Sequence, residues 1–299
     1  MRVRLRHNTA YHFDRSVKLG QHDVRLRPSA YCRTPILEYA LHVEPAGGPV
    51  YWYTDEAGNW VGRFLFSQPA REVRFDVDLV ADLASINPFH FLLDVSAAQF
   101  PFRYPDETAV QLTAALRADT GDAALDDWVE QLKSDFLSAG SINTVTLLVE
   151  LNLRVQREIK YIVRDGAGVQ TPEETIARAS GSCRDSSWLL VCVLRRLGLA
   201  ARFVSGYLIQ PASVMRQEQG GDSQMQLNAK AMRADLHAWA EVYIPGGGWI
   251  GLDPTSGLLC AEGHIPLAVA RTPSGAGPVE GSSSPSQDRL AHRVVVEPA

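Results

Sequence analysis

The chain contains 299 residues, of which 45% are hydrophobic, and it carries a net charge of −5. This length allows one large domain or two moderate ones, and the composition is that of a globular protein with a sizeable core. Because the net charge is negative and no basic tract is present, nucleic acid is not an expected partner.

The sequence also limits the compartment and the cofactors. It contains neither a recognisable signal peptide nor an apolar run long enough to span a bilayer, so we expect a cytoplasmic protein without a membrane partner. The histidines and cysteines do not have the spacing of a zinc site, and there is no EF-hand loop, so we expect no metal and no cofactor. Four cysteines without paired spacing indicate free thiols: Cys32, Cys183, Cys192 and Cys260.

Residues 1–86 are predicted to form an all-β, sandwich-like domain. The clearest strand is residues 72–81, where hydrophobic and charged side chains alternate. Noisier strand patterns occur at 9–17, 36–43 and 59–66. The aromatic residues Tyr51, Trp52, Tyr53 and Trp60 are expected to pack in the core or against a second domain. We therefore expect this domain to dock on the rest of the chain.

Residues 87–268 are predicted to form an α+β core that begins with helices. Helical stripes run through residues 125–136 and 148–162, and Asn143 is the expected cap of the second. Another helix is expected to start at the Thr171-Pro172-Glu173-Glu174 box. A strand is expected at 201–210. The loop at 211–234 that follows it is either a lid over the site or a disordered excursion.

The most informative segment is Gly181–Trp188, which reads GSCRDSSW. Ser182 is the predicted N-cap of an apolar helix, and Asp185 completes a capping box with it. Gly198 is expected to end this helix. A thiol in the first turn faces unpaired amides and the positive end of the helix dipole, which favours the thiolate. Cys183 is therefore a candidate nucleophile, although a small buried hydrophobic role is the alternative.

Two further residues strengthen this assignment. Residues 236–244 and 249–253 are predicted strands, and turn residues between them indicate an antiparallel hairpin. His237 lies at the start of the first strand and Asp253 at the end of the second. The hairpin therefore brings imidazole and carboxylate together, which makes a Cys183–His237–Asp253 triad geometrically possible. Helices followed by such a meander of strands predict an antiparallel sheet behind the cysteine helix.

The C-terminal residues 269–299 are predicted to be a tail. Residues 272–287 are rich in Pro, Gly and Ser and resemble a tail or linker. The closing residues 293–297 are either an added strand or the remnant of a longer architecture.

Three ordered motifs make the chain similar to a known superfamily: GSCRDS at 181–186, LHAWAEVY at 236–243 and GWIGLDPTSG at 248–257. They resemble those of the bacterial transglutaminase-like superfamily, whose core has a papain-type arrangement. The segment DEAGNWVGR at 55–63 resembles the β domain that precedes such cores in bacteria. The segments at 25–28, 32–35 and 87–89 are similar to long bacterial proteins that also carry an amide-ligase-like region. A functional link with an amide-ligase-like protein is therefore an expectation of the resemblance.

The expected chemistry is acyl transfer on a peptide or protein amide. Cys183 attacks the carbonyl, His237 transfers the proton, and Asp253 orients the imidazole. The backbone amide of Cys183 is one expected oxyanion donor, with Gln170 and Tyr161 as candidates for the second. Trp239 either shields the Cys–His pair or simply packs.

Several alternatives remain open at this point. Arg184 and Asp185 are assigned to the capping network rather than to catalysis. Water as acceptor gives a cysteine protease or amidase, and an amine gives a transglutaminase, so the triad does not decide between them. The alternatives from other classes are a non-catalytic binding module that retains the fold, and a thiol-redox protein using Cys183 and Cys192. The intact triad argues against the first, and the shared helix argues against the second.

Overall fold

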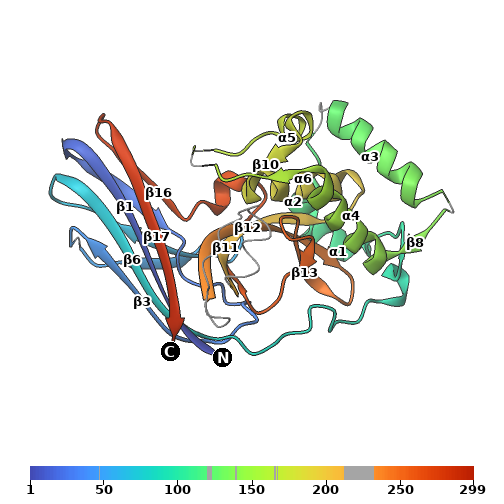
Figure 1. Ribbon diagram of the computed structural model, residues 1–299, viewed down its shortest axis with the longest axis horizontal. Helices are drawn as coiled ribbons and strands as arrows, with labels where there is room; N and C mark the ends of the chain where they lie inside the picture. The colour runs from blue at the N-terminus through green and yellow to red at the C-terminus, as the bar shows by residue number, and fades with distance from the viewer. Residues whose placement is uncertain (47, 120–122, 139, 165, 167, 212–231) are drawn as a thin grey trace, which may run out of the picture.

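The computed structural model describes residues 1–299 except 47, 120–122, 139, 165, 167 and 212–231. A strand-rich region occupies one side of the molecule, and a core of helices packed on a sheet occupies the other (Figure 1). This arrangement confirms the predicted fold class, an N-terminal all-β region followed by an α+β core.

The strand-rich region consists of two four-stranded antiparallel sheets that share one hydrophobic core. Its strands are β1 Arg2–Val17, β2 Leu19–Val24, β3 Ile36–Glu44, β4 Tyr51–Thr54, β5 Trp60–Phe64, β6 Ala70–Asp82, β16 Val279–Ser283 and β17 Asp288–Pro298. The order is β17-β1-β6-β3 in the first sheet and β16-β2-β5-β4 in the second. The predicted alternation is realised in β6, where Val73, Phe75 and Leu79 are fully buried. The four strands predicted for this region are therefore confirmed.

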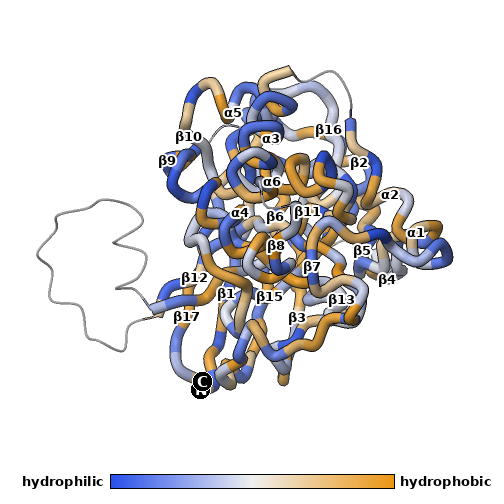
Figure 2. Tube along the Cα trace, turned by 90° about the vertical axis from the view of Figure 1, so that its right-hand side faces the viewer, coloured by the Kyte–Doolittle hydropathy of each residue, from blue (hydrophilic) through white to orange (hydrophobic). Residues whose placement is uncertain are grey.

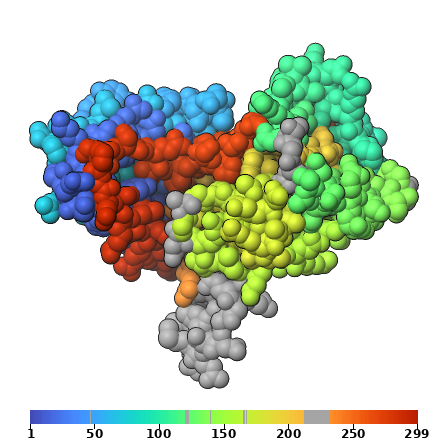
Figure 3. All heavy atoms as spheres, turned by 90° about the horizontal axis from the view of Figure 1, so that it is seen from above, coloured from blue at the N-terminus to red at the C-terminus, as the bar shows by residue number. Residues whose placement is uncertain are grey.

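The C-terminal segment lies against the N-terminal region (Figure 3) and contributes one strand to each of these sheets. The sequence predicts a tail or linker at 272–287, but β16 lies in this range and pairs with β2 from Val279 onward. Strand β17 pairs with β1 from Val3–Pro298 to Phe13–Asp288. The prediction of a tail at 272–287 was wrong, whereas the added strand that was one alternative for 293–297 is present in β17. Composition reflects local turn preference, but these strands are held by partners at the other end of the chain. The division of the chain at residues 86 and 268 stays a prediction.

The helices of the core come before its sheet in the sequence. They are α1 Asp106–Gln111, α2 Thr113–Leu116, α3 Ala123–Phe136, α4 Thr144–Glu158, α5 Pro172–Arg178 and α6 Cys183–Arg196. Shorter elements connect them: η1 Val95–Ala97, η2 Pro273–Ala276, β7 Gln99–Phe100, β8 Ile142–Asn143, β9 Lys160–Tyr161 and β10 Ser180–Gly181. As predicted, Asn143 caps α4, and Thr171 and Glu174 form the capping box of α5. The helix predicted at 125–136 is confirmed as α3. The helix predicted at 148–162 is confirmed as α4, but it ends at Glu158, and Lys160–Tyr161 form β9 instead.

The sheet of the core is antiparallel throughout and carries α6 on one face. Its strands are β11 Ala201–Pro211, β12 Met232–Ile244, β13 Gly248–Asp253, β14 Leu258–Leu259 and β15 His264–Ala270, in the order β14-β13-β12-β11-β15. Ala238, Ala240 and Val242 of β12 face the apolar side of α6. Figure 2 shows hydrophobic residues gathered along α6 and hydrophilic residues on outer helices such as α3.

The predicted hairpin of β12 and β13 is present, with a turn over residues 245–247. The loop predicted at 211–234 is only partly accounted for. Its residues 212–231 lie outside the described part of the chain, and residues 232–234 belong to β12. The choice between a lid and a surface excursion therefore stays untested.

The far ends of β11, β12 and β15 pack against the sandwich through Tyr207, Ile209, Ala234, Ile265 and Leu267, so the predicted docking of the two parts is confirmed. The ring nitrogen Nδ1 of His7 lies 2.9 Å from the hydroxyl of Tyr207 across this interface. Asn59 donates from Nδ2 to the carbonyl of Val269 and accepts the Val269 amide at Oδ1, both at 2.8 Å. Its side chain thereby pairs with β15 as a neighbouring strand would. The sandwich thus holds β15, the strand that begins at His264, in a fixed position.

Candidate active site

The start of α6 places Cys183 at an open helix N-terminus. Ser182 is the N-cap residue with an extended backbone, and Cys183 is the first helical residue of a 14-residue helix. Buried residues such as Leu189, Leu190 and Val193 fix the rest of this helix in the core. The thiol is half-buried and lies in the first turn of α6, at the positive end of the helix dipole. Cys183 is therefore presented at the N-terminal end of α6.

Asp185 organises the residues around the cysteine. Its buried carboxylate accepts the amide and the hydroxyl of Ser182, at 2.7 and 2.8 Å, and the amide of Gln170 at 2.8 Å. The guanidinium of Arg164 lies 2.7 Å away. Burial would raise the pKa of Asp185, but these donors outweigh it and lower the pKa below its usual value.

Arg184, the other residue assigned to the capping network, donates to the carbonyls of Arg164 and Gly166, both at 3.1 Å. The contacts of Asp185 and Arg184 therefore lie in the structural framework of the helix entrance. Sequence reasoning identified Asp185 as a cap but gave no sign of Arg164 as its partner, because the segment between them has no periodic pattern.

The β12–β13 hairpin brings His237 and Asp253 together. The Nε2 atom of His237 lies 3.1 Å from Oδ2 of Asp253, and only 8% and 1% of the two side chains are exposed. The backbone amide of Thr255 donates to the other carboxylate oxygen at 2.9 Å. Cys183 lies near enough to His237 to raise the pKa of its imidazole. Because Nε2 faces Asp253, the other ring nitrogen, Nδ1, is the one available to the sulfur.

The charges in this cluster stabilise one another. Burial would lower the pKa of His237, but the charges of Asp253 and Cys183 outweigh it and raise the pKa well above its usual value. Burial would likewise raise the pKa of Asp253, but His237 and His264 hold it well below the usual range. The arrangement therefore favours an imidazolium at His237 beside the Asp253 carboxylate.

The other candidate residues lie around this cluster. Trp239 is 1% exposed, and its ring is stacked near that of His237, with centroids 6.5 Å apart and planes at 28°. The Oε1 atom of Gln170 accepts the hydroxyl of Thr175 at 3.2 Å. Tyr161 in β9 is the parallel-strand partner of Gly181, two residues before Cys183. Trp239 therefore covers one side of the histidine, while Gln170 and Tyr161 lie beside the entrance of α6.

A further residue of the site, His264, was missed from the sequence. Its Nε2 atom lies 3.3 Å from Oδ2 of Asp253, the same oxygen that His237 contacts. The sequence contains no motif around His264, and its position depends on the pairing of β15 with β11, where His264 faces Leu208. The order of strands in the sheet was the missing information.

The same three side chains are the one group of possible metal ligands in the described part of the chain. Ligand atoms of His237, Asp253 and His264 lie within 4.8 Å of one another. However, Nδ1 of His264 accepts the amide of Ala261 at 3.3 Å, so the proton of a neutral ring lies on Nε2. A protonated Nε2 faces Asp253 as a donor and cannot ligate a metal. The residues therefore fit a hydrogen-bonded cluster better than a metal centre.

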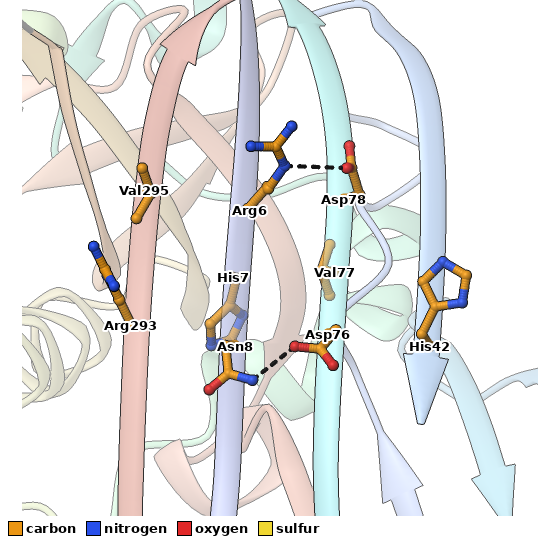
Figure 4. A pocket seen from close by; sticks show the side chains of 9 residues that line it. All are labelled: Arg6, His7, Asn8, His42, Asp76, Val77, Asp78, Arg293 and Val295. Carbon is orange, nitrogen blue, oxygen red and sulfur yellow. Dashed lines mark hydrogen bonds and ion pairs between the residues drawn. The ribbon is translucent and has the colours of Figure 1, made fainter. Parts of the chain in front are cut away.

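Two hollows lie on the described surface, one of them beside the histidine cluster. A groove of about 400 Å³ lies between the sandwich, the residues 88–91 and the core sheet, and both Trp239 and His264 line it. A hollow of about 470 Å³ lies on the outer face of the first sandwich sheet (Figure 4). In this second hollow Asn8 pairs with Asp76 at 2.7 Å, and Arg6 pairs with Asp78 at 3.5 Å. Each of these polar side chains therefore has a partner on the neighbouring strand, which is typical of a solvated sheet face.

The fold and the cluster define a protein with a cysteine-protease-like core, in which a helix bearing a cysteine packs on an antiparallel sheet. Residues 3–82 match the bacterial transglutaminase-like N-terminal region, and residues 135–254 match the transglutaminase-like superfamily. The chain therefore belongs to the transglutaminase-like superfamily and carries the bacterial N-terminal region. This confirms the resemblance seen in the three sequence motifs.

Similar proteins extend over nearly the whole chain. The uncharacterized protein Rv2569c of Mycobacterium tuberculosis is 25% identical over 287 residues, which cover 94% of this chain and 87% of that protein. The uncharacterized protein ML0607 of Mycobacterium leprae is 22% identical over 283 residues, which cover 94% and 92%. A "putative cysteine protease" from Cytophaga hutchinsonii has a TM-score of 0.66 at 18% identity, covering 98% of this chain and 90% of that chain. The last comparison supports the fold.

Proposed function

We propose that this protein carries out thiol-dependent acyl transfer on amide bonds, with Cys183 as nucleophile, His237 as acid and base, and Asp253 as the orienting carboxylate. The observation that carries the proposal is the 3.1 Å contact of the buried His237 with Asp253, at a place where Cys183 is near enough to raise the pKa of the imidazole. Such a chain of nucleophile, base and orienting group is the arrangement that activates a nucleophile in acyl transfer.

The first half of the reaction forms a thioester. The Cys183 thiolate attacks the carbonyl carbon of the amide and forms a C–S bond. The imidazolium of His237 then gives its proton to the leaving nitrogen, the C–N bond breaks, and the amine departs. His237 is neutral at this stage, and its Nε2–H still faces the Asp253 carboxylate. In the second half, neutral His237 takes a proton from water or an incoming amine, which attacks the thioester and releases the thiolate.

The oxyanion of each half-reaction requires donors that are already in place. The backbone amide of Cys183 at the first position of α6 is one candidate. Gln170 is the better of the two candidates for the second, because Asp185 holds its backbone and Thr175 holds its Oε1. These contacts leave its Nε2 group without a hydrogen bond to the described residues. Tyr161 is the other candidate, beside Gly181.

The substrate class that fits the site is a peptide or protein amide. Hydrolysis gives a cysteine protease or amidase, and transfer to an amine gives a transglutaminase; the triad chemistry is identical in both cases. A cytoplasmic location fits the four free thiols and is part of the proposal. A functional link with an amide-ligase-like protein rests on the sequence resemblance alone. No described helix combines the length and the apolar character needed to cross a membrane.

The alternatives from other classes receive less support. A binding module that retains the fold has no need for the buried His237–Asp253 contact beside a half-buried thiol. A thiol-redox role for Cys183 and Cys192 would require a disulfide across about 13 Å of helix α6.

The test is to trap the acyl-enzyme. The full-length protein is incubated with a library of peptide amides, quenched in acid, digested and analysed by mass spectrometry. We expect an acyl adduct on the peptide that contains Cys183, no such adduct in Cys183→Ala, and an undiminished adduct in Cys260→Ala. Binding of library members without any adduct on Cys183 would favour the binding module instead.

A further inference from the structure

His264 contacts the cluster from a strand outside the matched superfamily region, which ends at residue 254. It lies at the start of β15, and 11% of its side chain is exposed. Its Nε2 atom lies 3.3 Å from Oδ2 of Asp253. Asp253 therefore has three donors within reach: Nε2 of His237 and Nε2 of His264 at one oxygen, and the amide of Thr255 at the other.

The surroundings of His264 fix both its position and its tautomer. The amide of Ala261 donates to Nδ1, and the amide of His264 itself donates to the carbonyl of Ala261 at 3.0 Å. Because Nδ1 accepts a hydrogen bond, a neutral ring must carry its proton on Nε2, which points at Asp253. The ring also meets Trp239 edge to face, with centroids 5.2 Å apart and planes at 82°.

The turn that carries His264 is itself held in place. A Cβ atom on Gly263 would collide with the carbonyl oxygen of Ile209, so the turn packs directly on β11. The amide of Ile209 donates to the carbonyl of Gly263 at 2.9 Å. The imidazole of His264 is therefore presented by rigid backbone, as a group that positions a functional residue should be.

We propose that His264 is a positioning residue that holds the Asp253 carboxylate toward His237 by donating a hydrogen bond from its neutral Nε2 atom. The inference rests on the function proposed above, in which Asp253 orients His237. Without this donor the Asp253 carboxylate keeps, among the described residues, only the Thr255 amide besides His237, and can turn away from the catalytic ring. A loosened Asp253 stabilises the His237 imidazolium less well, so the imidazolium loses its proton at lower pH.

The charged and titratable groups around His237, Asp253 and His264 come from five elements or from residues next to them. Cys183 faces His237 from α6, Asp253 from the end of β13, and Asp235 from its own strand β12. His264 approaches Asp253 from β15. Cys260 follows β14, and the charge of Asp253 contributes to raising the pKa of its thiol. Of these groups, His264 is the neutral donor to the carboxylate besides the backbone.

Two measurements test the proposal without any substrate. In the full-length protein with ¹⁵N-labelled histidines, we expect the His264 signals of a neutral ring with the proton on Nε2 at pH 7. An Nδ1-protonated or doubly protonated ring would overturn the assignment. The second measurement is the rate of iodoacetamide alkylation of Cys183 as a function of pH, whose alkaline limb reports loss of the His237 proton.

For alkylation we compare wild type, His264→Phe, His264→Gln and His90→Phe. The Phe variant keeps the ring against Trp239 but removes the donor, the Gln variant restores an N–H donor, and His90 is an exposed residue of the same groove. We expect the alkaline limb of His264→Phe to move to lower pH by about half a unit or more, with at least partial recovery in His264→Gln and no change in His90→Phe. An unchanged limb, or a shift to higher pH, would contradict the proposal.

The proposed function can fail separately from this inference. If wild-type Cys183 forms no acyl adduct, the acyl-transfer assignment fails, while the tautomer and the alkylation profile still report whether His264 positions the Asp253–His237 pair. If an acylated substrate is found, His264→Phe should lower the single-turnover acylation rate by about 10- to 100-fold, the range for partners that orient functional ligands. An acylation rate equal to that of His90→Phe would contradict a positioning role.

Discussion

Trp239 occupies the space that a side chain at Gly206 would need. Gly206 is the β11 partner of His237, and a Cβ atom at this position would come within 2.5 Å of Cη2 of Trp239. The indole in turn lies against the rings of His237 and His264. The absence of a side chain on β11 thus allows the tryptophan to cover the histidine cluster.

This relationship predicts the effect of Gly206→Ala. We expect the free energy of unfolding to fall by about 1–3 kcal/mol because the added methyl group overpacks the site. Alkylation of Cys183 should also slow, because a displaced Trp239 disturbs His237. Urea denaturation and peptide-resolved alkylation measure the two effects. The matched control is Gly48→Ala, where a Cβ atom would meet nothing within 4 Å; equal effects in both variants would contradict the packing argument.

The buried His7 at the interface predicts a dependence of stability on pH. Burial, followed by the nearby His292, lowers the pKa of His7 from 6.5 to about 4. Between these values the unfolded chain binds a proton that the folded chain does not, so stability falls as the pH drops from 6.5 to about 4. The full loss is on the order of 3 kcal/mol. Urea unfolding of wild type and His7→Gln between pH 4 and 7 should show a flatter dependence in the variant.

The control for this prediction is His42→Gln, which changes an exposed histidine on the same sandwich. Its pH dependence should follow that of the wild type. If the His7→Gln curve instead runs parallel to the wild-type curve, His7 is not the group responsible for the loss of stability.

The four cysteines are expected to differ sharply in reactivity. Burial raises the pKa of Cys32 to about 11 and that of Cys260 well above its usual value, and Cys192 is buried in the core. Cys183 is half-buried, faces the His237 imidazolium and begins a helix. Peptide-resolved alkylation with iodoacetamide at pH 7 should therefore label Cys183 first. Labelling at the rate of a free model thiol would remove the case for an activated nucleophile.

The C-terminal strands predict the outcome of truncation. Removing residues 278–299 deletes β16 and β17 and uncovers the edges of β1 and β2. Because β17 pairs with β1 along eleven positions, we expect a loss of at least about 3 kcal/mol in the free energy of unfolding. A control lacking only residues 298–299 should be close to wild type. A stable protein without residues 278–299 would show that these strands are accessory.

The sequence was informative wherever structure is determined locally. The box at Ser182 and Asp185 predicted the start of α6, and the turn after Ile244 predicted the hairpin that joins His237 to Asp253. Both depend on residues close together in the chain, where capping and turn chemistry decide the backbone.

The features that were missed or left open depend on contacts between distant residues. A strand at residues 293–297 was one of two alternatives, because β17 is mostly exposed and its partner β1 lies at the opposite end of the chain. His264 reaches Asp253 only because β15 pairs with β11 rather than with β14, its neighbour in sequence. Strand order of this kind is set by tertiary packing, which no local period encodes.

The assignment of Cys183, His237 and Asp253 as a triad is tested by the acylation rate of Cys183 in single turnover. The substrate is a peptide amide identified by trapping, and circular dichroism verifies the fold of each variant. We expect no adduct in Cys183→Ala, a loss of up to about 10⁶-fold in His237→Ala, and a smaller loss, at most about 10⁴-fold, in Asp253→Asn. The loss of acylation rate in Cys183→Ala should be at least as large as that in His237→Ala, and the loss in His237→Ala should exceed that in Asp253→Asn. A folded, fully active Asp253→Asn protein beside an inactive His237→Ala protein would contradict the assignment of Asp253 as the orienting carboxylate.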